Sequence, residues 1–398
     1  DVDLHIESQK KWIQDKGPTI ETNIGYIETY LDPQNVRAYW EGFVSIVNKS
    51  RSKKYANLVE KYQEVVKAFP WPNAYRKDKF LEPDFTSLDI ITFASTGCPL
   101  GINIPNYDLV RNDVGFKNVY LANNALNYRN ANLSFIRKED EDLLKEIGSQ
   151  AYELHVALHE LIGHGSGKLF FEDEHGKLNF DPETTMKLLS EGKIESHYKH
   201  GETWNEKFGR ISCSFEECRA DVSGIFLGYE PSAYEIFGFN KDNINDAMKC
   251  TVMSHLRKAV LGLKLFNPEM KKWGQAHTQG AFVFLHFMLK HQDPKKKAVD
   301  ILMSAEQDEF WFVVNAENMA TEGRRVTSLL LQHLQQYKST ADNKAGEEFY
   351  HKYSQVNEFF LKIREIVMNN QKPRRLDIYH ELEVKEKEVV EKTSEVSL

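Results

Sequence analysis

The sequence predicts an α+β fold in which strands and loops come early and helices dominate the rest. Short runs of β-branched or aromatic residues, separated by turn residues, occur at 20–30 and 87–124, as is typical of strands. After Asp140, apolar residues recur at spacings of three and four, which is typical of helices. The chain has 398 residues, enough for two or three packed units.

The expected elements can be placed in chain order. The alternation in residues 20–30 predicts a strand. Residues 36–68 predict a helix because apolar residues recur at helical spacing, and the prolines of FPWP at 69–72 end it. Residues 87–124 predict strands and loops.

The remaining two thirds of the chain is predicted to be mainly helical. A helix that starts near 143 ends in the glycine-rich residues 163–167, and residues 170–205 predict a loop. The charged tail from 380 predicts a solvated helix or a disordered segment. Long helices are expected at about 206–228, 241–265, 272–291, 295–312, 321–337 and 344–369.

Composition excludes several classes of partner. The net charge is −8 with a pI near 6.0, so we expect no nucleic-acid partner, because such proteins carry basic faces. The densest apolar run, residues 281–289, is too short to span a membrane and is interrupted by His286, so we expect no membrane span.

Cysteine usage and the N-terminus suggest a cytoplasmic protein. Four cysteines, none in a C-x-x-C pair, indicate reduced thiols, with pairing of Cys213 and Cys218 as the alternative. The chain starts with neither Met nor a signal-peptide pattern, so we expect it to be part of something longer.

One short motif indicates metal chemistry. In HELIGH, His159 and His164 are five residues apart, whereas zinc peptidase helices carry H-E-x-x-H with a spacing of four. On a regular helix, that extra residue moves the side chains from about 40° to about 140° apart. The two can share one ion only if a π-bulge absorbs the extra residue, and Gly163 supplies backbone freedom for one. The alternative is a surface helix that matches by chance.

A second motif, EECRAD, supplies carboxylates. A catalytic zinc needs a third protein ligand and an open position. Glu217 and Asp221 are four apart and share a helix face, with Glu216 offset. One carboxylate can bind the metal while the others orient the histidines, and Glu160 remains to take a proton from water. The alternative is a solvated acidic face. Two histidines and one carboxylate suit Zn²⁺, one per chain.

Together, HELIGHGSGKL and EECRAD closely resemble the H-E-x-x-G-H and E-E-C-R-A-E/D motifs of the dipeptidyl peptidase III family. The similarity extends from about residue 10 to 376. Further similar segments are WIQDKGP (12–18), IGYIETY (24–30), FPWP (69–72), KFLEPDFTSLD (79–89), GINIPNYD (101–108), GETW (201–204) and QAH (275–277).

The resemblance implies roles at the metal. His159, His164 and Glu217 would bind zinc, and Glu160 would activate the water.

It also implies that Glu216 and Asp221 orient the two histidines. The family usually has Glu where Asp221 stands, and Asp is shorter by one methylene, so its carboxylate reaches less far from the helix.

For the substrate, the resemblance implies that Tyr30 and His277 contact the scissile carbonyl. An enzyme that releases dipeptides must also hold a free α-ammonium group, which a carboxylate suits. The implied substrate-binding residues are Glu28, Asn103, Asn106 and, by a loose alignment, Arg374.

The family has a helical zinc lobe and a β-rich lobe, much of which comes from a region that this chain does not include. The resemblance implies a mainly α-helical zinc catalytic lobe and a partial β-rich second lobe. The predicted division is 1–48 and 87–132 for the remnant of the β-rich lobe, 49–86 and 133–376 for the zinc lobe, and 377–398 for a charged tail.

Three functions follow. The first is a monomeric, cytoplasmic zinc exopeptidase that releases N-terminal dipeptides from oligopeptides. The second is a truncated fragment that binds zinc or peptides with weak or no turnover. The third is another kind of zinc aminopeptidase.

Overall fold

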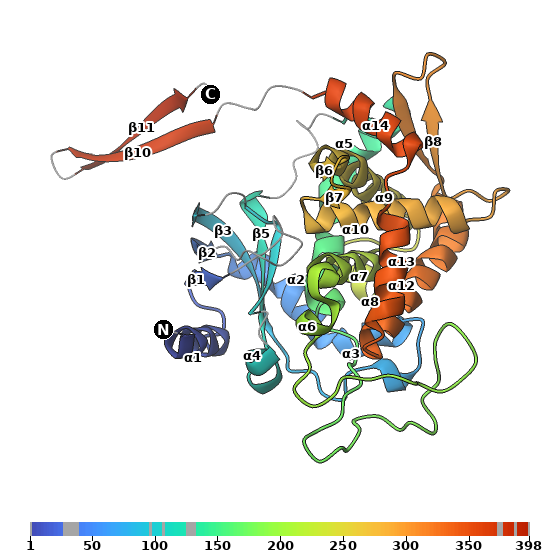
Figure 1. Ribbon diagram of the computed structural model, residues 1–398. Coiled ribbons are helices and arrows are strands. Elements are labelled where there is room, and N and C mark those ends of the chain that lie inside the picture. The colour runs from blue at the N-terminus through green and yellow to red at the C-terminus, as the bar shows by residue number, and fades with distance from the viewer. Residues whose placement is uncertain are drawn as a thin grey trace.

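A computed structural model of the chain describes residues 2–26, 40–94, 98–105, 108–124, 133–371, 377–385 and 388–396. It consists of a sheet layer beside a larger helical layer (Figure 1), and the α+β expectation is confirmed. Among the described residues, no helix combines the length and apolarity needed to cross a bilayer.

The sheet has five strands in the order β1-β2-β3-β5-β4. All neighbours pair antiparallel except β3 and β5, which are parallel. This arrangement places β4, the edge strand, against the helical layer. The strands are β1 (Ile20–Tyr26), β2 (Trp40–Val47), β3 (Asp84–Ala94), β4 (Gly101–Ile104) and β5 (Lys117–Leu121).

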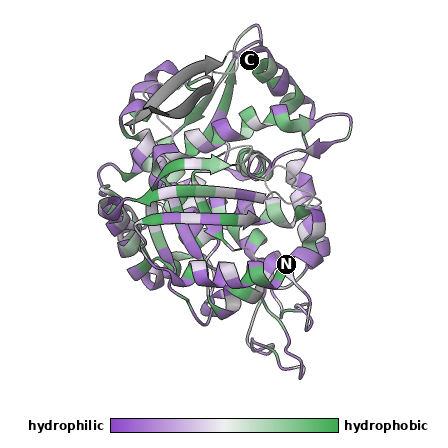
Figure 2. Ribbon diagram, turned by 90° about the vertical axis from the view of Figure 1, so that its left-hand side faces the viewer, coloured by the Kyte–Doolittle hydropathy of each residue, from purple (hydrophilic) through white to green (hydrophobic). Residues whose placement is uncertain are grey.

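Helix α1 (Val2–Gln14) contacts the sheet at a buried ion pair between β1 and β5, through a hydrogen bond from Trp12. The Lys117 ammonium lies 2.9 Å from Glu21 Oε2, and Trp12 donates to Glu21 Oε1 at 2.6 Å. Ile24 on β1 and Trp40 on β2 are exposed. Figure 2 shows apolar residues along the strands that cross in front of the helices.

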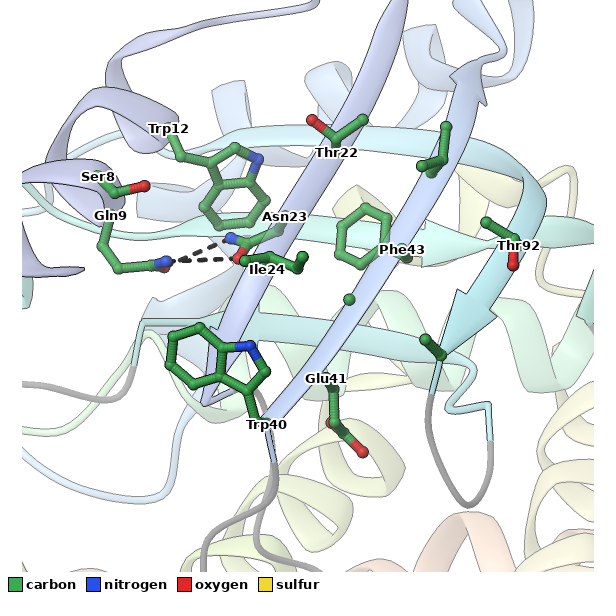
Figure 3. A pocket seen from close by; sticks show the side chains of 13 residues that line it. Ser8, Gln9, Trp12, Thr22, Asn23, Ile24, Trp40, Glu41, Phe43 and Thr92 are labelled. Atoms are coloured by element: carbon green, nitrogen blue, oxygen red, sulfur yellow. Dashed lines mark hydrogen bonds between the residues drawn. The ribbon is translucent and has the colours of Figure 1, made fainter.

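A pocket of about 530 Å³ lies between α1 and the strands β1, β2 and β3 (Figure 3). Trp12, Phe43 and Trp40 form part of its lining, and the amides of Gln9 and Asn23 hydrogen bond beside it. This lining contains none of the described residues that the sequence predicts for the active site.

The helical layer is built around α7, which is buried over most of its length. Its neighbours are α5, α10 and α12, while α9 packs against α5 and α10. These helices surround the second motif, which lies on α7. The long helices are α5 (Lys138–Leu158), α7 (Ser212–Leu227), α9 (Ile244–Leu261), α10 (Ala276–His291) and α12 (Arg324–Ser339).

The predicted helix at 36–68 is wrong over its first part. Residues 40–47 form β2, and α2 (Lys49–Glu60) begins after Asn48, whose side chain accepts a hydrogen bond from Arg51 N. Residues four apart share a face in a strand as well as in a helix, so the spacing of Phe43 and Val47 fits both.

The predicted helix at 295–312 is also wrong. The structure has a hairpin of β8 (Val299–Met303) and β9 (Phe310–Val314), in which alternate residues of β9 are buried. The aromatic and β-branched residues of β9 suit a strand packed on one face.

The C-terminal region differs in two further ways. Residues 344–369 form two helices, α13 (Asn343–Ser354) and α14 (Glu358–Asn369), because Asn357 caps a new helix. In place of a helical or disordered tail, β10 (Asp377–Lys385) pairs with β11 (Glu388–Val396). Leu382 and Val384 alternate with charged residues in this segment, a pattern that is compatible with a strand.

Candidate metal centre and active site

The end of α5 carries the predicted bulge. The helix continues into η4 (His159–Gly163), a π-helical turn in which His164 N donates to His159 O at 3.0 Å. A Cβ added to Gly163 would lie 2.7 Å from Ala220 Cα on α7, so only glycine allows the two helices to approach this closely. The bulge brings His159 Nε2 and His164 Nε2 to 3.2 Å from each other.

Glu217 on α7 completes a set of three donor atoms. Its Oε2 lies 3.2 Å from His159 Nε2 and 3.5 Å from His164 Nε2. Tetrahedral zinc with bonds of about 2.0–2.1 Å separates its ligand atoms by roughly 3.4 Å. The three predicted ligands therefore converge with the spacing that one zinc ion requires.

The opposite ring nitrogens explain why a cation fits here. His159 Nδ1 lies 2.9 Å from Asp221 Oδ1, and His164 Nδ1 lies 3.2 Å from Glu216 Oε1. When each Nδ1 donates to its carboxylate, each Nε2 directs a lone pair toward the other and toward Glu217. Glu217 Oε2 is buried and accepts no hydrogen bond from the part of the chain that the structure describes. The two Nε2 lone pairs and the Glu217 carboxylate repel one another, and a cation between them would remove that repulsion.

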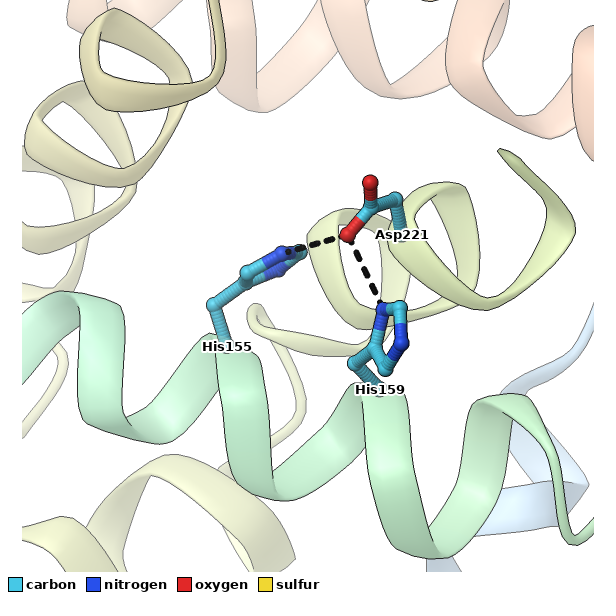
Figure 4. Close-up of side chains that lie close together, drawn as sticks. All are labelled: His155, His159 and Asp221. Carbon is cyan, nitrogen blue, oxygen red and sulfur yellow. Dashed lines mark hydrogen bonds and ion pairs between the residues drawn. The ribbon is translucent and has the colours of Figure 1, made fainter. Parts of the chain in front are cut away.

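Asp221 holds His159 in place and is itself held by a cation. Lys258 Nζ lies 2.8 Å from its Oδ2. His155 Nε2 lies 3.2 Å from its Oδ1, and Figure 4 shows His155 and His159 on either side of this carboxylate. Burial opposes ionisation, but Lys258 and the neighbouring histidines hold the pKa of Asp221 well below its usual value. Asp221 therefore reaches His159, although its side chain is one methylene shorter than the glutamate that the family usually has here.

His155, His159 and Asp221 form a second group of potential ligand atoms. The Lys258 ammonium already supplies the positive charge at Asp221. This arrangement favours a structural role for the group. The candidate metal site is then the set of His159, His164 and Glu217.

Glu216 orients His164 within a buried network that contains Arg219. The guanidinium donates to both oxygens of Glu216, at 2.6 and 2.9 Å, and to Gly163 O at 2.6 Å. Burial would raise the pKa of Glu216, but Arg219 and Lys338 hold it well below its ordinary range. The role of Arg219 did not come from sequence reasoning, although the residue stands within EECRAD.

Glu160 is buried at the start of the bulge. Its carboxylate packs against strand β4, where a Cβ on Gly101 would lie 2.5 Å from Glu160 Oε1. Burial raises the pKa of Glu160, which brings a carboxylate closer to the range useful for a general base.

His277, near the start of α10, lies beside the three predicted metal ligands. Its Nδ1 is 3.3 Å from Glu217 Oε2, and its ring centroid is 5.9 Å from that of His159. Burial lowers the pKa of His277 to about 4, so the imidazole is neutral at pH 7. Its contact with the scissile carbonyl stays a prediction.

Asn103 lies where β4 meets the bulged helix. Its Nδ2 donates to Glu160 O at 2.7 Å and to Asn118 Oδ1 at 2.6 Å, and its Oδ1 accepts from Arg111. Its role in holding substrate stays a prediction. The other proposed substrate residues, Glu28, Tyr30, Asn106 and Arg374, lie outside the described residues.

His159, His164 and Glu217 converge in one site, and a second glutamate, Glu160, follows His159 in η4. This arrangement is typical of metallopeptidases. The chain belongs to peptidase family M49, whose model matches residues 1–398. The resemblance inferred from the two motifs is therefore confirmed.

Curated relatives support the same assignment. The chain is 42% identical over 377 residues to dipeptidyl peptidase 3 of Nematostella vectensis. It is 40% identical over 382 residues to dipeptidyl peptidase 3 of Homo sapiens. Each match covers 94% of this chain and 52% of the relative, so the chain spans about half the length of these proteins.

Solved structures show a similar fold. DPP III from Caldithrix abyssi matches with a TM-score of 0.63 and 20% identity, over 91% of this chain and 61% of that one. Dipeptidyl-peptidase III from Corallococcus sp. strain EGB matches with a TM-score of 0.67 and 19% identity, over 92% and 60%.

Proposed function

We propose that the chain carries the zinc site of a peptidase that releases dipeptides from the N-terminus of oligopeptides. The observation that carries the proposal is the convergence of His159 Nε2, His164 Nε2 and Glu217 Oε2 within 3.5 Å of one another. The name shared by the curated relatives supports dipeptide release as the activity.

A zinc ion held by these three residues would act as a Lewis acid and lower the pKa of a water molecule. Asp221 and Glu216 keep the two histidines in the tautomer that presents Nε2 to the metal. Both carboxylates are themselves paired with cations. Although burial opposes it, the neighbouring carboxylates raise the pKa values of His159 and His164 in the metal-free chain, so zinc would bind in competition with protons.

Glu160 acts as the general base in the proposed reaction. It takes a proton from the water that attacks the peptide carbonyl and returns a proton to the leaving amine. Its burial, which disfavours the charged form, strengthens its tendency to accept that proton. His277 is neutral at pH 7 and retains one N–H that can donate to the carbonyl oxygen.

We further infer that the substrates are oligopeptides and that the chain acts as a cytoplasmic monomer. In this proposal, Glu28 and Asn106 hold the N-terminal end of the peptide, Arg374 binds further along it, and Tyr30 contacts the scissile carbonyl. Asn103 would join them by exchanging one of its internal hydrogen bonds for one to the peptide. The distance from the bound ammonium to the metal would then set the length of the released product at two residues.

The second candidate is a fragment that binds zinc or peptide without efficient turnover. The chain spans 52% of the length of the two relatives named above, so turnover measured on this chain decides between the first two candidates. A zinc aminopeptidase that removes single residues is the third candidate, and the product distinguishes it.

The test measures zinc content and product release by the purified chain, using an Arg-Arg arylamide. Zinc at one per chain with release of Arg-Arg supports the first candidate. Zinc without turnover supports the fragment, and release of free arginine supports the aminopeptidase. A folded chain that binds no zinc would overturn the ligand assignment.

The role of Glu160 is tested with Glu160→Gln, which should abolish turnover and leave zinc bound. Glu146→Gln is the matched control, since Glu146 is an exposed carboxylate on the same helix. Turnover that survives in Glu160→Gln would exclude this residue as the base.

A further inference from the structure

Strand β4 contacts Glu160 through two residues of one face. Gly101 and Asn103 are two apart in the strand, so they project to the same side of the sheet. A Cβ on Gly101 would lie 2.5 Å from Glu160 Oε1 and 2.8 Å from its Cγ. Asn103 Nδ2 donates to the backbone carbonyl of Glu160 at 2.7 Å. One strand therefore meets both the side chain and the main chain of the same glutamate.

The end of the metal-site helix is held by side chains from elsewhere in the fold. Carbonyls in the last turn of a helix lack intrahelical donors and need other partners. Asn103 supplies a donor to Glu160 O, and Arg219 supplies one to Gly163 O. These two donors come from different layers, since Asn103 belongs to the sheet and Arg219 to α7.

The Asn103 amide is fixed in one orientation. Its second N–H donates to Asn118 Oδ1 on β5 at 2.6 Å, and its Oδ1 accepts from Arg111 Nη1 at 2.6 Å. Arg111, on α4 (Asp108–Asp113), also donates to Pro105 O at 3.1 Å. The side chain of Asn103 is buried, so both amide hydrogens are committed within the protein.

The metal ligands are oriented by other residues. Asp221 and Glu216, both on α7, bind the Nδ1 atoms of His159 and His164. The sheet thus contacts the proposed base, while α7 orients the histidines.

We propose that β4 is a positioning element for Glu160, in which Gly101 leaves room for the carboxylate and Asn103 holds its main chain. The two are positioning residues, because they act through Glu160. The inference rests on the proposed function of Glu160 as the base, and it adds that the sheet sets the position of this carboxylate independently of zinc binding.

The test compares Gly101→Ala and Asn103→Ala with the unchanged chain in three measurements. Zinc affinity is measured by competition with a chelator. The carboxylate stretching band of Glu160 is measured by infrared difference spectroscopy and assigned by its loss in Glu160→Gln. The third measurement is kcat and KM for dipeptide release.

We expect the Glu160 band to shift in both variants while zinc affinity stays within about twofold. We expect kcat to fall by roughly 100-fold in Gly101→Ala with little change in KM, because a base displaced by about 1 Å loses activity on that order. Asn103→Asp keeps the acceptor for Arg111 but removes the donor to Glu160, so it should shift the band with less disturbance of packing.

Two variants in β1 are matched controls. A Cβ on Gly25 would lie 2.7 Å from His5 Cε1, so Gly25→Ala crowds the same sheet away from Glu160. Asn23 is a buried amide bonded to Gln9, so Asn23→Ala removes a comparable group. Neither should shift the Glu160 band, and urea midpoints report any loss of stability.

An unchanged Glu160 band in Gly101→Ala and in both Asn103 variants would overturn the proposal. So would zinc affinity that falls in parallel with kcat, since β4 would then only support the fold. A rise in KM alone at Asn103 would assign this residue to substrate binding. The band and zinc affinity need no turnover, so failure of the proposed function can be distinguished from failure of this inference.

Discussion

Replacing Gly163 with alanine should weaken zinc binding because it separates the two helices that supply the ligands. The new Cβ would lie 2.7 Å from Ala220 Cα and 3.0 Å from Ala220 O, which are backbone atoms of α7. Carbon atoms pack at about 3.5 Å or more, so η4 and α7 must move apart by roughly 0.8 Å. His159 and His164 lie on one side of this contact and Glu217 on the other.

That displacement is large relative to the tolerance of a metal site. Zinc–ligand distances vary by only about 0.2 Å, so the three ligands cannot all keep their bonds. We expect zinc affinity to fall by about 100-fold, or about 2.7 kcal/mol. Crowding should also destabilise the fold by about 1–3 kcal/mol, partly offset by the higher helix propensity of alanine.

The assay is chelator competition for zinc, together with urea unfolding of the metal-free chain. Gly346→Ala on α13 is the control, since its Cβ would lie 2.8 Å from Phe208 Cε1, outside the metal site. It should change the urea midpoint without changing zinc affinity. A folded Gly163→Ala chain that binds zinc within twofold of the original would refute the reasoning.

Two further predictions concern ionisable side chains whose surroundings decide their charge. Lys258→Met leaves Asp221 buried without its ammonium partner. We expect the free energy of unfolding, measured with urea, to fall by about 2–3 kcal/mol. We also expect zinc binding, measured by chelator competition, to weaken roughly tenfold. The stability loss should be smaller than for a fully buried pair because the Lys258 side chain keeps 23% exposure. Lys258→Arg should retain most of both quantities, and equal losses in the two variants would contradict the role of the charge. Burial lowers the pKa of His333 to about 4, below the value near 6.5 of an unfolded chain. The folded chain therefore favours the neutral imidazole, and the resulting contribution to stability is present above pH 6.5 and is lost as pH falls toward 4. His333→Gln should therefore reduce the change in urea midpoint between pH 7 and pH 5, and an unchanged difference would exclude His333 as a source of acid sensitivity.

The type of a secondary-structure element was predictable where the spacing of apolar residues fits only a helix or only a strand. The strand at Ile20–Tyr26 and the helix of EECRAD follow from spacings that only one element satisfies. The helices predicted for residues 40–47 and 299–314 are wrong because apolar residues four apart share a face in a strand as well as in a helix. Pairing with a distant strand decides between them, and β2 pairs with β3, whose first residue, Asp84, is far along the chain.

The candidate site shows the same division. HELIGH by itself implied the π-bulge, because two histidines five apart can reach one ion only from a distorted helix, and the bulge is present. Spacing alone did not decide which carboxylate is the candidate metal ligand. The structure favours Glu217 because its Oε2 meets both Nε2 atoms, whereas Asp221 is occupied by Lys258.

The donor types, their local geometry and the family could be predicted from the chain's residues, since these depend on positions close together in the sequence. Three contacts could be found only in the folded chain: Lys258 from α9 neutralises Asp221, Arg219 reaches the carbonyl of Gly163, and Asn103 from β4 reaches that of Glu160. These contacts join segments between 37 and 57 residues apart. They form because close packing of η4 against α7 and β4 leaves buried charges and carbonyls that must find partners.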